Sequence, residues 1–240
     1  MKAVSKTDIG LRSSNQDACG CGLLPDGAWM VVCDGMGGAN GGNIASEMAL
    51  SCMTEQISNE YQPEMESNAI RNLLTAAAYT ANTQVYDASM NTPELSGMGT
   101  TLVAAIVTRG KAHIVHAGDS RAYHITHSGV HQVTMDHSIV QEMLNRGDIT
   151  VIQARHHPHK NIITRALGVQ EMIDVDYTEL DFGQGETLLA CSDGLSNYIH
   201  AEQMYQYARS YQGQELADAL VQAALASGGS DNITVTLIED

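Results

Sequence analysis

Four aspartates lie at the ends of apolar segments, where a strand would begin or end. Three of them are followed at once by Gly or Asn. They are Asp34 in VVCDGMGG, Asp119 in VHAGDSRAY, Asp193 in LLACSDGL and Asp231 in SDNITVTL. Side chains at strand ends lie on the rim of a sheet, so several rims brought together would form a cluster of carboxylates. Such carboxylates repel one another unless cations lie between them, and Mg²⁺ and Mn²⁺ prefer oxygen ligands. The pattern therefore indicates a metal site built from oxygen ligands.

A glycine-rich stretch, GMGGANGG, follows the first of these aspartates at residues 35–42. The dinucleotide-binding pattern G-x-G-x-x-G would need Gly at the position of Asn40, and the P-loop pattern with its lysine is absent. A plain turn between a strand and a helix is one interpretation. The favoured one is that Gly35, which has no Cβ, allows its own carbonyl to approach a metal held by Asp34.

Hydrophobic periodicity predicts the elements that must position these residues. Apolar, β-branched segments predict strands at 28–33, 101–108, 111–117, 187–191 and 233–238. Apolar residues at helical spacing predict helices at 43–58, 68–88, 201–209 and 214–226. The first two helices follow each other directly instead of alternating with single strands, which argues against a doubly wound parallel sheet. The order favours packed sheets flanked by helical layers.

Length, composition and charge narrow the class of protein. The chain has 240 residues, of which 43% are hydrophobic, and no segment resembles a linker, so one globular domain is expected. Its net charge of −16 argues against nucleic acid and anionic membranes as partners. No run approaches about 18 apolar residues, and the first residues lack the apolar core of a signal peptide. Five cysteines without paired spacing predict reduced thiols and a cytoplasmic protein.

Eight motifs, taken in order, resemble the metal-dependent protein phosphatases, the PPM or type 2C family, in their bacterial form. They are TDIGLRSSNQD, VVCDGMGG, GMGTTLVAA, HAGDSRAY, VTMDHS, ITRALG, CSDGLSNY and SDNITV, and they extend from Thr7 to Val235. The resemblance implies an α+β fold in which a central antiparallel β-sandwich is flanked on both faces by helix pairs, a four-layer α-β-β-α arrangement. It also implies that residues 1–240 form a single PPM-type phosphatase catalytic domain.

The same resemblance implies which residues bind metal. Asp34 would bridge two ions, Mn²⁺ or Mg²⁺, and Gly35 would ligate one of them through its carbonyl. Asp193 and Asp231 would complete the ligand shell of the other ion. Asp119, together with Asp193, resembles the pair that binds a third, weaker metal in bacterial members.

Residues around the expected metals also match the family. Arg12 corresponds to the arginine that binds the substrate phosphate, and its planar guanidinium can donate two parallel hydrogen bonds to phosphate oxygens. Asp17 corresponds to an acidic residue near the water shell of the metals. Gln16 stands where many members have Glu, which is expected to alter one water-mediated contact to a metal. Met36 replaces a histidine that animal relatives use as a proposed general acid.

The catalytic residues are therefore expected to be Arg12, Asp34, Asp193 and Asp231. The expected reaction is direct hydrolysis of phosphoserine and phosphothreonine in proteins. Two divalent ions about 3.5–4 Å apart would acidify a shared water that attacks the phosphoryl group in line. The resemblance implies that the partners are phosphorylated proteins and the bacterial Ser/Thr kinase that the enzyme opposes, and that the protein is a monomer.

Two other functions stay open on the sequence alone. One is a catalytically weak or inactive phosphatase-like binding module, although members of that kind typically lose metal aspartates and this chain retains Asp34, Asp193 and Asp231. The other is a serine hydrolase, suggested by Ser120 in a Gly-Asp-Ser sequence with a histidine downstream. That interpretation leaves Asp193 and Asp231 without a role.

Two groups of histidines have favoured structural interpretations. Asp136 and His137 could form a catalytic dyad, but hydrogen bonding that fixes a loop is the favoured role. His156, His157 and His159 could bind a transition metal, but a solvated segment near the active site is favoured.

Overall fold

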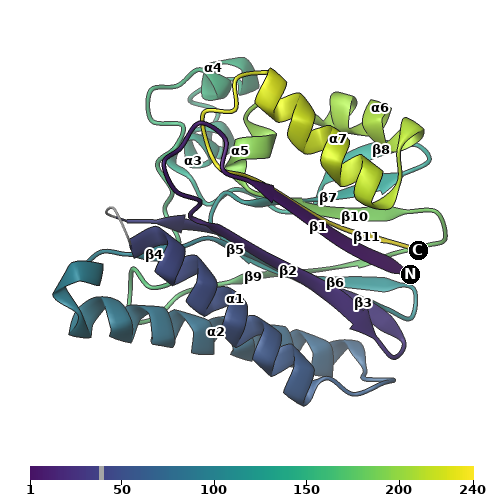
Figure 1. Cartoon of the computed structure of the whole chain (residues 1–240), viewed down its shortest axis with the longest axis horizontal. Coiled ribbons are helices and arrows are strands. Elements are labelled where there is room, and N and C mark those ends of the chain that lie inside the picture. The colour runs from purple at the N-terminus through teal and green to yellow at the C-terminus, as the bar shows by residue number, and fades with distance from the viewer. Residues whose placement is uncertain (38–40) are drawn as a thin grey trace.

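Two antiparallel sheets pack face to face, and helices cover both outer faces (Figure 1). The computed structural model describes residues 1–37 and 41–240. Gly38, Ala39 and Asn40, which belong to the glycine-rich stretch, lie outside the described residues. The expected four-layer α-β-β-α arrangement of the α+β fold is confirmed.

The two sheets are built from strands that are distant in sequence. The five-stranded sheet has the order β1 (Lys2–Asp8), β11 (Ile233–Glu239), β10 (Thr187–Cys191), β7 (Arg121–Thr126) and β8 (Gly129–Gln132). The six-stranded sheet has the order β2 (Asp17–Leu24), β3 (Gly27–Met36), β5 (Leu102–Thr108), β6 (Lys111–Ala117) and β9 (Asp176–Asp181), and β4 (Gly99–Thr100) pairs with β3. β1 pairs with β11 along its whole length, so the two chain ends lie side by side (Figure 1).

Helices form the outer layers. The long helices α1 (Gly41–Glu60) and α2 (Ser67–Asn91) cover the six-stranded sheet. The five-stranded sheet is covered by α5 (Asp193–Ser196), α6 (Ala201–Ser210) and α7 (Gly213–Ala226). The connections contain η1 (Pro93–Leu95), α3 (Ile139–Arg146) and α4 (Val151–Arg155). Within residues 1–37 and 41–240, no helix has the length and hydrophobicity needed to span a membrane.

Successive side chains of the central strands point to opposite faces of their sheet. The buried side chains therefore form three hydrophobic layers, one between the sheets and one under each helical layer. In β10, Leu188 and Ala190 face the opposite sheet, whereas Leu189 and Cys191 face α5, α6 and α7. β3 and β5 divide their side chains in the same way between the sandwich interior and the α1–α2 layer. Both faces of these strands are buried, which is why they appear in the sequence as continuous apolar runs.

The strands that sequence periodicity did not reveal are mostly edge strands. β1, β2, β8 and β9 form the four edges of the two sheets. The other two missed strands are β7, which lies next to an edge, and the two-residue β4. β1 reads KAVSKTD and β9 reads DYTELD, so both are rich in charged residues. An edge strand has a neighbour on one side only and exposes more of its surface to solvent. Polar residues are therefore compatible with it, and they hide it from a search for apolar runs.

We expect Leu188→Ala to lower the free energy of unfolding by about 2–5 kcal/mol, because truncating this fully buried side chain leaves a cavity between the sheets. Leu23→Ala is the matched control, because Leu23 lies in edge strand β2 and is 67% exposed. Its effect should stay below about 0.5 kcal/mol. Urea unfolding followed by circular dichroism measures both, and equal losses would contradict the interior position of Leu188.

Candidate metal centre

The four aspartates at strand ends meet at one end of the sandwich. Asp34 lies in β3, Asp119 follows β6, Asp193 begins α5 directly after β10, and Asp231 precedes β11. All four line a cavity of about 510 Å³. Because β3 and β6 belong to one sheet and β10 and β11 to the other, the cavity exists only where both sheets are in place.

The other residues singled out in the sequence lie in or beside this cavity. Arg12, Gln16, Gly35 and Met36 contribute to its lining. Asp17 is buried behind it and lies directly opposite Asp34 in the pairing of β2 with β3. The fold thus brings together every residue that the sequence assigned to the metals, their surroundings or the substrate phosphate.

The carboxylates raise one another's pKa values. Burial, followed by the charges of Asp17 and Asp193, holds the pKa of Asp34 well above its ordinary value. Burial and the charge of Asp193 raise the pKa of Asp119 to about 7. Burial likewise raises the pKa of Asp17 to about 6. Burial and the charge of Asp231 raise the pKa of Asp193. Charging all of these groups together is unfavourable unless positive charge enters the cavity.

The donor set fits hard divalent cations. The ionisable donors of the cavity are carboxylates, and no histidine or cysteine is found among the described residues that line it. Mn²⁺ and Mg²⁺ prefer such oxygen ligands, whereas zinc and copper sites in proteins favour imidazole and thiolate. In addition, the buried Oδ1 atom of Asp17 has no hydrogen-bond partner in the part of the chain that the structure describes. A site of this composition suits two or more hydrated hard cations.

Sequence reasoning missed the role of Asn232, which holds the loop between β1 and β2 against the cavity. Its side-chain oxygen accepts a hydrogen bond from the backbone N–H of Gln16 at 2.8 Å. Its side-chain nitrogen donates to the carbonyls of Ile9 at 2.9 Å and Ser14 at 3.0 Å. This loop carries Arg12, so Asn232 fixes the position from which the guanidinium reaches the cavity. The motif SDNITV was the available signal, but its asparagine contacts a segment more than 200 residues away.

Ser192, also missed, connects the two sheets at the site. Its hydroxyl donates to Oδ2 of Asp17 at 2.8 Å and accepts from the backbone N–H of Thr234 at 3.1 Å. Asp17 belongs to the six-stranded sheet, whereas Ser192 and Thr234 belong to the five-stranded side. Asn197 has a similar supporting role, because its side-chain nitrogen donates to Oδ2 of Asp193 at 3.0 Å. These hydrogen bonds orient carboxylates that would otherwise separate by repulsion.

Arg12 lies at the mouth of the cavity. Its Nη2 donates to Oδ2 of Asp231 at 2.7 Å, and its Nε donates to the carbonyl of Ser230 at 3.1 Å. The side chain of Arg12 is 57% exposed, so solvent and ligands reach it. A cation at this position lowers the cost of bringing an anionic ligand to a strongly acidic cavity.

Gly35 is required by packing at the start of α1. A Cβ atom on Gly35 would lie 2.0 Å from the carbonyl oxygen of Gly42 and 2.6 Å from that of Gln16. The Gly35 N–H also donates to the Gln16 carbonyl at 3.0 Å. The sequence interpretation attributed this glycine to the approach of its carbonyl to a metal, whereas the structure gives a steric reason that holds without one.

Ser120 does not have the surroundings of a nucleophile. It is 1% exposed, and its hydroxyl shares a hydrogen bond of 2.7 Å with the hydroxyl of Thr101. Thr101 in turn accepts from the backbone N–H of Asp34 at 2.9 Å. Ser120 therefore supports the strand that carries Asp34, and the structure offers no support for a serine hydrolase.

Asp136 and His137 make the hydrogen bonds of a structural pair. Oδ2 of Asp136 accepts from Nη2 of Arg121 at 2.6 Å. Nδ1 of His137 accepts from the backbone N–H of Gly118 at 3.1 Å, next to Asp119. The two interactions hold the chain on either side of Asp119, in keeping with the favoured interpretation.

His137 also meets His116 and Asp176 in a cluster with metal-ligand spacing. Nε2 of His116 donates to the carbonyl of Met135 at 2.9 Å, and Nδ1 of His137 is already an acceptor. Nε2 of His137 lies 3.4 Å from Oδ2 of Asp176 and 3.3 Å from Nη1 of Arg165. Both ring nitrogens of His137 are therefore engaged in polar contacts that connect β6 with β9.

The segment with His156, His157 and His159 follows α4 and is largely exposed. The rings of His157 and His159 meet edge to face, with centroids 5.5 Å apart. Nδ1 of His157 accepts from the backbone N–H of His159 at 3.1 Å. That nitrogen is engaged in a local turn, in keeping with a solvated segment.

We expect Asp119→Asn to stabilise the chelator-treated protein at pH 8. The pKa of Asp119 is raised from 3.8 to about 7, so between these pH values the folded protein keeps a proton that the unfolded chain has released. The contribution of Asp119 to stability therefore falls as pH rises from 3.8 to about 7. The advantage of the variant should vanish as pH falls toward about 4. Thermal unfolding in EDTA across pH 4–8 measures it, with exposed Asp87→Asn as the control. A variant less stable than wild type at pH 8 would contradict the electrostatic analysis.

Comparisons with known proteins agree with the site. Residues 8–227 match the family model described as Protein phosphatase 2C. The chain is 38% identical to the serine/threonine phosphatase stp of Listeria welshimeri, over 100% of this chain and 96% of that protein. It superposes on the structure of Stp1 from Staphylococcus aureus with a TM-score of 0.92 and 33% identity, covering 100% of this chain and 95% of that one.

A further solved structure is the catalytic domain of the serine/threonine phosphatase PstP in complex with two manganese ions. The likeness has a TM-score of 0.87 and 30% identity, and covers 98% of this chain and 96% of that one. These matches extend over nearly the whole chain and agree in sequence and in structure, which confirms the resemblance found in the eight motifs. The chain belongs to the protein phosphatase 2C, or PPM, family.

Proposed function

We propose that this protein is a Mn²⁺- or Mg²⁺-dependent phosphatase that hydrolyses phosphoserine and phosphothreonine in proteins. The observation that carries the proposal is the cavity lined by Asp34, Asp119, Asp193 and Asp231, with Arg12 at its mouth. The named activity of the Listeria relative and the two manganese ions of the PstP structure support it.

The metal ligands are assigned from the resemblance to the family. Asp34, Asp193 and Asp231, with the carbonyl of Gly35, would hold two ions, and Asp119 with Asp193 would hold a third, weaker one. When bound, the cations would supply positive charge for the phosphoryl oxygens and a water acidic enough to be the nucleophile near pH 7. All of these residues line the same cavity.

The remaining groups keep the carboxylates charged and oriented. The backbone N–H of Asn232 donates to Oδ1 of Asp231 at 2.9 Å, and Asn197 donates to Asp193. Hydrogen bonds to a carboxylate favour its charged form, which is the form that binds metal. Asp17, held by Ser192, and Gln16, a neutral group, would orient water molecules around the ions.

Arg12 would bind the phosphate of the substrate. Its exposed guanidinium can offer two parallel N–H groups to two phosphate oxygens. Met36 lines the cavity where a general acid would lie in animal relatives, and its thioether carries no proton to give. The proton that the departing serine or threonine oxygen needs would therefore come from solvent.

We also propose that residues 1–240 form a single catalytic domain that acts as a monomer in the cytoplasm. Five free cysteines are in keeping with a reducing compartment. Its partners would be phosphorylated proteins, together with a Ser/Thr kinase whose products it hydrolyses. A net charge of −16 is unsuited to binding nucleic acid or anionic membranes.

The first test is release of phosphate from a phosphothreonine peptide while Mn²⁺ is titrated against a chelator. We expect release only with Mn²⁺, and Asp34→Asn, Asp193→Asn and Asp231→Asn should each lower kcat by about 100-fold or more, since each removes a carboxylate ligand. Asp87→Asn, on the exposed face of α2, is the matched control and should retain full activity. Absence of release from folded wild-type protein at every Mn²⁺ concentration would instead favour a phosphatase-like binding module.

The second test concerns Arg12. We expect Arg12→Ala to raise KM by about tenfold or more and to lower kcat less, because the guanidinium mainly binds the phosphate of the bound substrate. Arg12→Lys should recover only part of the loss, since an ammonium lacks the planar pair of donors. Steady-state kinetics with the same peptide measure both variants. An unchanged KM in Arg12→Ala would show that Arg12 has another role.

A further inference from the structure

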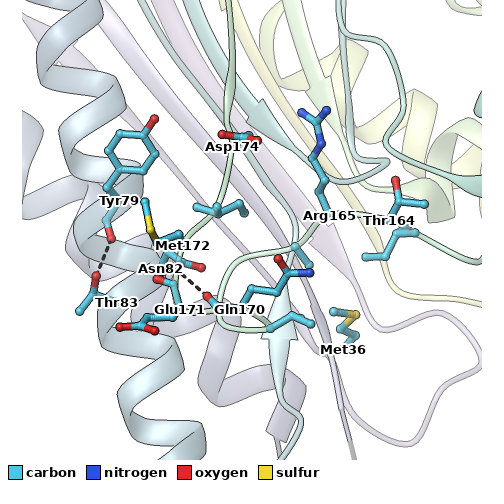
Figure 2. A pocket seen from close by; sticks show the side chains of 14 residues that line it. Met36, Tyr79, Asn82, Thr83, Thr164, Arg165, Gln170, Glu171, Met172 and Asp174 are labelled. Carbon is cyan, nitrogen blue, oxygen red and sulfur yellow. Dashed lines mark hydrogen bonds between the residues drawn. The ribbon is translucent and has the colours of Figure 1, made fainter.

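A larger cavity, of about 780 Å³, adjoins the carboxylate cavity. Figure 2 shows the side chains that line it. Met36 and Ile163 line both, so the two cavities lie on either side of a shared boundary. From this shared boundary the larger cavity extends as a groove between α2 and residues 163–174. None of the steps proposed for hydrolysis uses this groove.

The wall of the groove is held by a buried polar residue of α2. Asn82 is 2% exposed, and its Nδ2 donates to the carbonyls of Gln170 and Glu171, both at 3.1 Å. Its Oδ1 accepts from the backbone N–H of Gly168 at 2.8 Å. Gly168 has a φ of +83°, and a Cβ there would lie 2.2 Å from Cγ1 of Val85. The turn that forms this wall is therefore tied to the helix by three hydrogen bonds, so the groove has a defined shape.

Apolar side chains are exposed along the groove. Val169 is 49% exposed and Met172 is 83% exposed, although both are large and apolar. Tyr79, on the α2 side, is 46% exposed (Figure 2). Exposed apolar groups gathered around a groove are typical of a surface that binds another molecule.

The charge of the groove is negative. Glu171 and Asp174 are exposed carboxylates in its lining. Among the described residues that line the groove, Arg165 alone is basic. Nη1 of Arg165 lies 2.9 Å from Oδ1 of Asp176, so the positive charge of Arg165 is already compensated. A ligand with an apolar side chain and a positive charge would match this surface.

We propose that this groove binds the segment of a protein substrate that flanks the phosphorylated residue, and that it favours an apolar side chain and a lysine or arginine there. The inference rests on the proposed function, because a phosphate bound beside Arg12 would bring the residues next to it toward the shared boundary at Met36 and Ile163, where the groove begins. Extended chain advances about 3.3 Å per residue, so four residues on one side of the phosphorylated one extend about 13 Å.

The test uses two pairs of phosphothreonine peptides that all carry a leucine near the phosphorylated residue. The two members of a pair differ in having lysine or glutamate within four positions of it. Each pair is made with the variable residue before or after the phosphothreonine. In at least one of the two pairs, we expect wild type to hydrolyse the lysine peptide with a kcat/KM about fivefold or more above that of the glutamate peptide. The preference should weaken in high salt, because exposed charges are screened.

Glu171→Lys combined with Asp174→Lys should abolish or invert this preference. Hydrolysis of p-nitrophenyl phosphate, which has no flanking chain, should stay unchanged in the same variant. Both side chains are exposed, and Asn82 contacts only the backbone of residue 171, so the variant should fold normally. Circular dichroism and thermal unfolding check this.

The matched control is Glu202→Lys combined with Glu215→Lys. These exposed residues lie in α6 and α7, in the opposite helical layer, and change the net charge by the same amount (Figure 1). An equal loss of preference in both double variants would mean that net charge decides it, and would overturn the proposal. So would a wild type that treats all peptides alike while hydrolysing p-nitrophenyl phosphate. If wild type hydrolyses neither kind of substrate, the proposed function itself fails, and this inference with it.

Discussion

Repulsion among partly buried carboxylates is the constraint on which this end of the molecule depends. Burial and the neighbouring charges raise the pKa values of Asp17, Asp34, Asp119 and Asp193 together. In the absence of cations, the repulsion among these carboxylates lowers the stability of the fold. The same arrangement provides oxygen ligands on several sides of one cavity. The electrostatic cost to the fold and the capacity to bind divalent metal therefore have one physical origin.

The sandwich resists this repulsion by holding the aspartates with backbone pairing and side-chain hydrogen bonds. Asp34 lies within a strand that pairs with neighbours on both sides, and Asp231 lies two residues before the start of β11, which pairs with β1 and β10. Ser192 connects Asp17 to the opposite sheet, and Asn232 holds the loop of Arg12. The geometry of the site is therefore a property of the contact between the sheets, and a change in their packing would move ligands that belong to different sheets relative to each other.

Chemistry and recognition occupy adjacent but different surfaces. The carboxylates of the first cavity lie at or near strand ends, and both sheets are buried between helical layers. The neighbouring groove is formed by one face of α2 and a turn that Asn82 holds to the helix. Side chains in that turn can change without altering the strands that carry the aspartates. This separation would let relatives share one reaction and differ in the proteins on which they act.

The sequence by itself determined the central strands and the four long helices, because buried strands and amphipathic helices leave strong apolar patterns. It also determined the identity of the cavity aspartates, because they stand at the ends of those apolar segments. It did not reveal edge strands such as β1 and β9, whose exposed surfaces admit charged residues. The roles of Ser192 and Asn232 depend on partners in other parts of the chain, and no local pattern encodes such a partner. The groove is the clearest case, since its walls come from residues 79–83 and 163–174. Only tertiary packing brings these segments together, because a surface made by two distant segments exists only after both have folded.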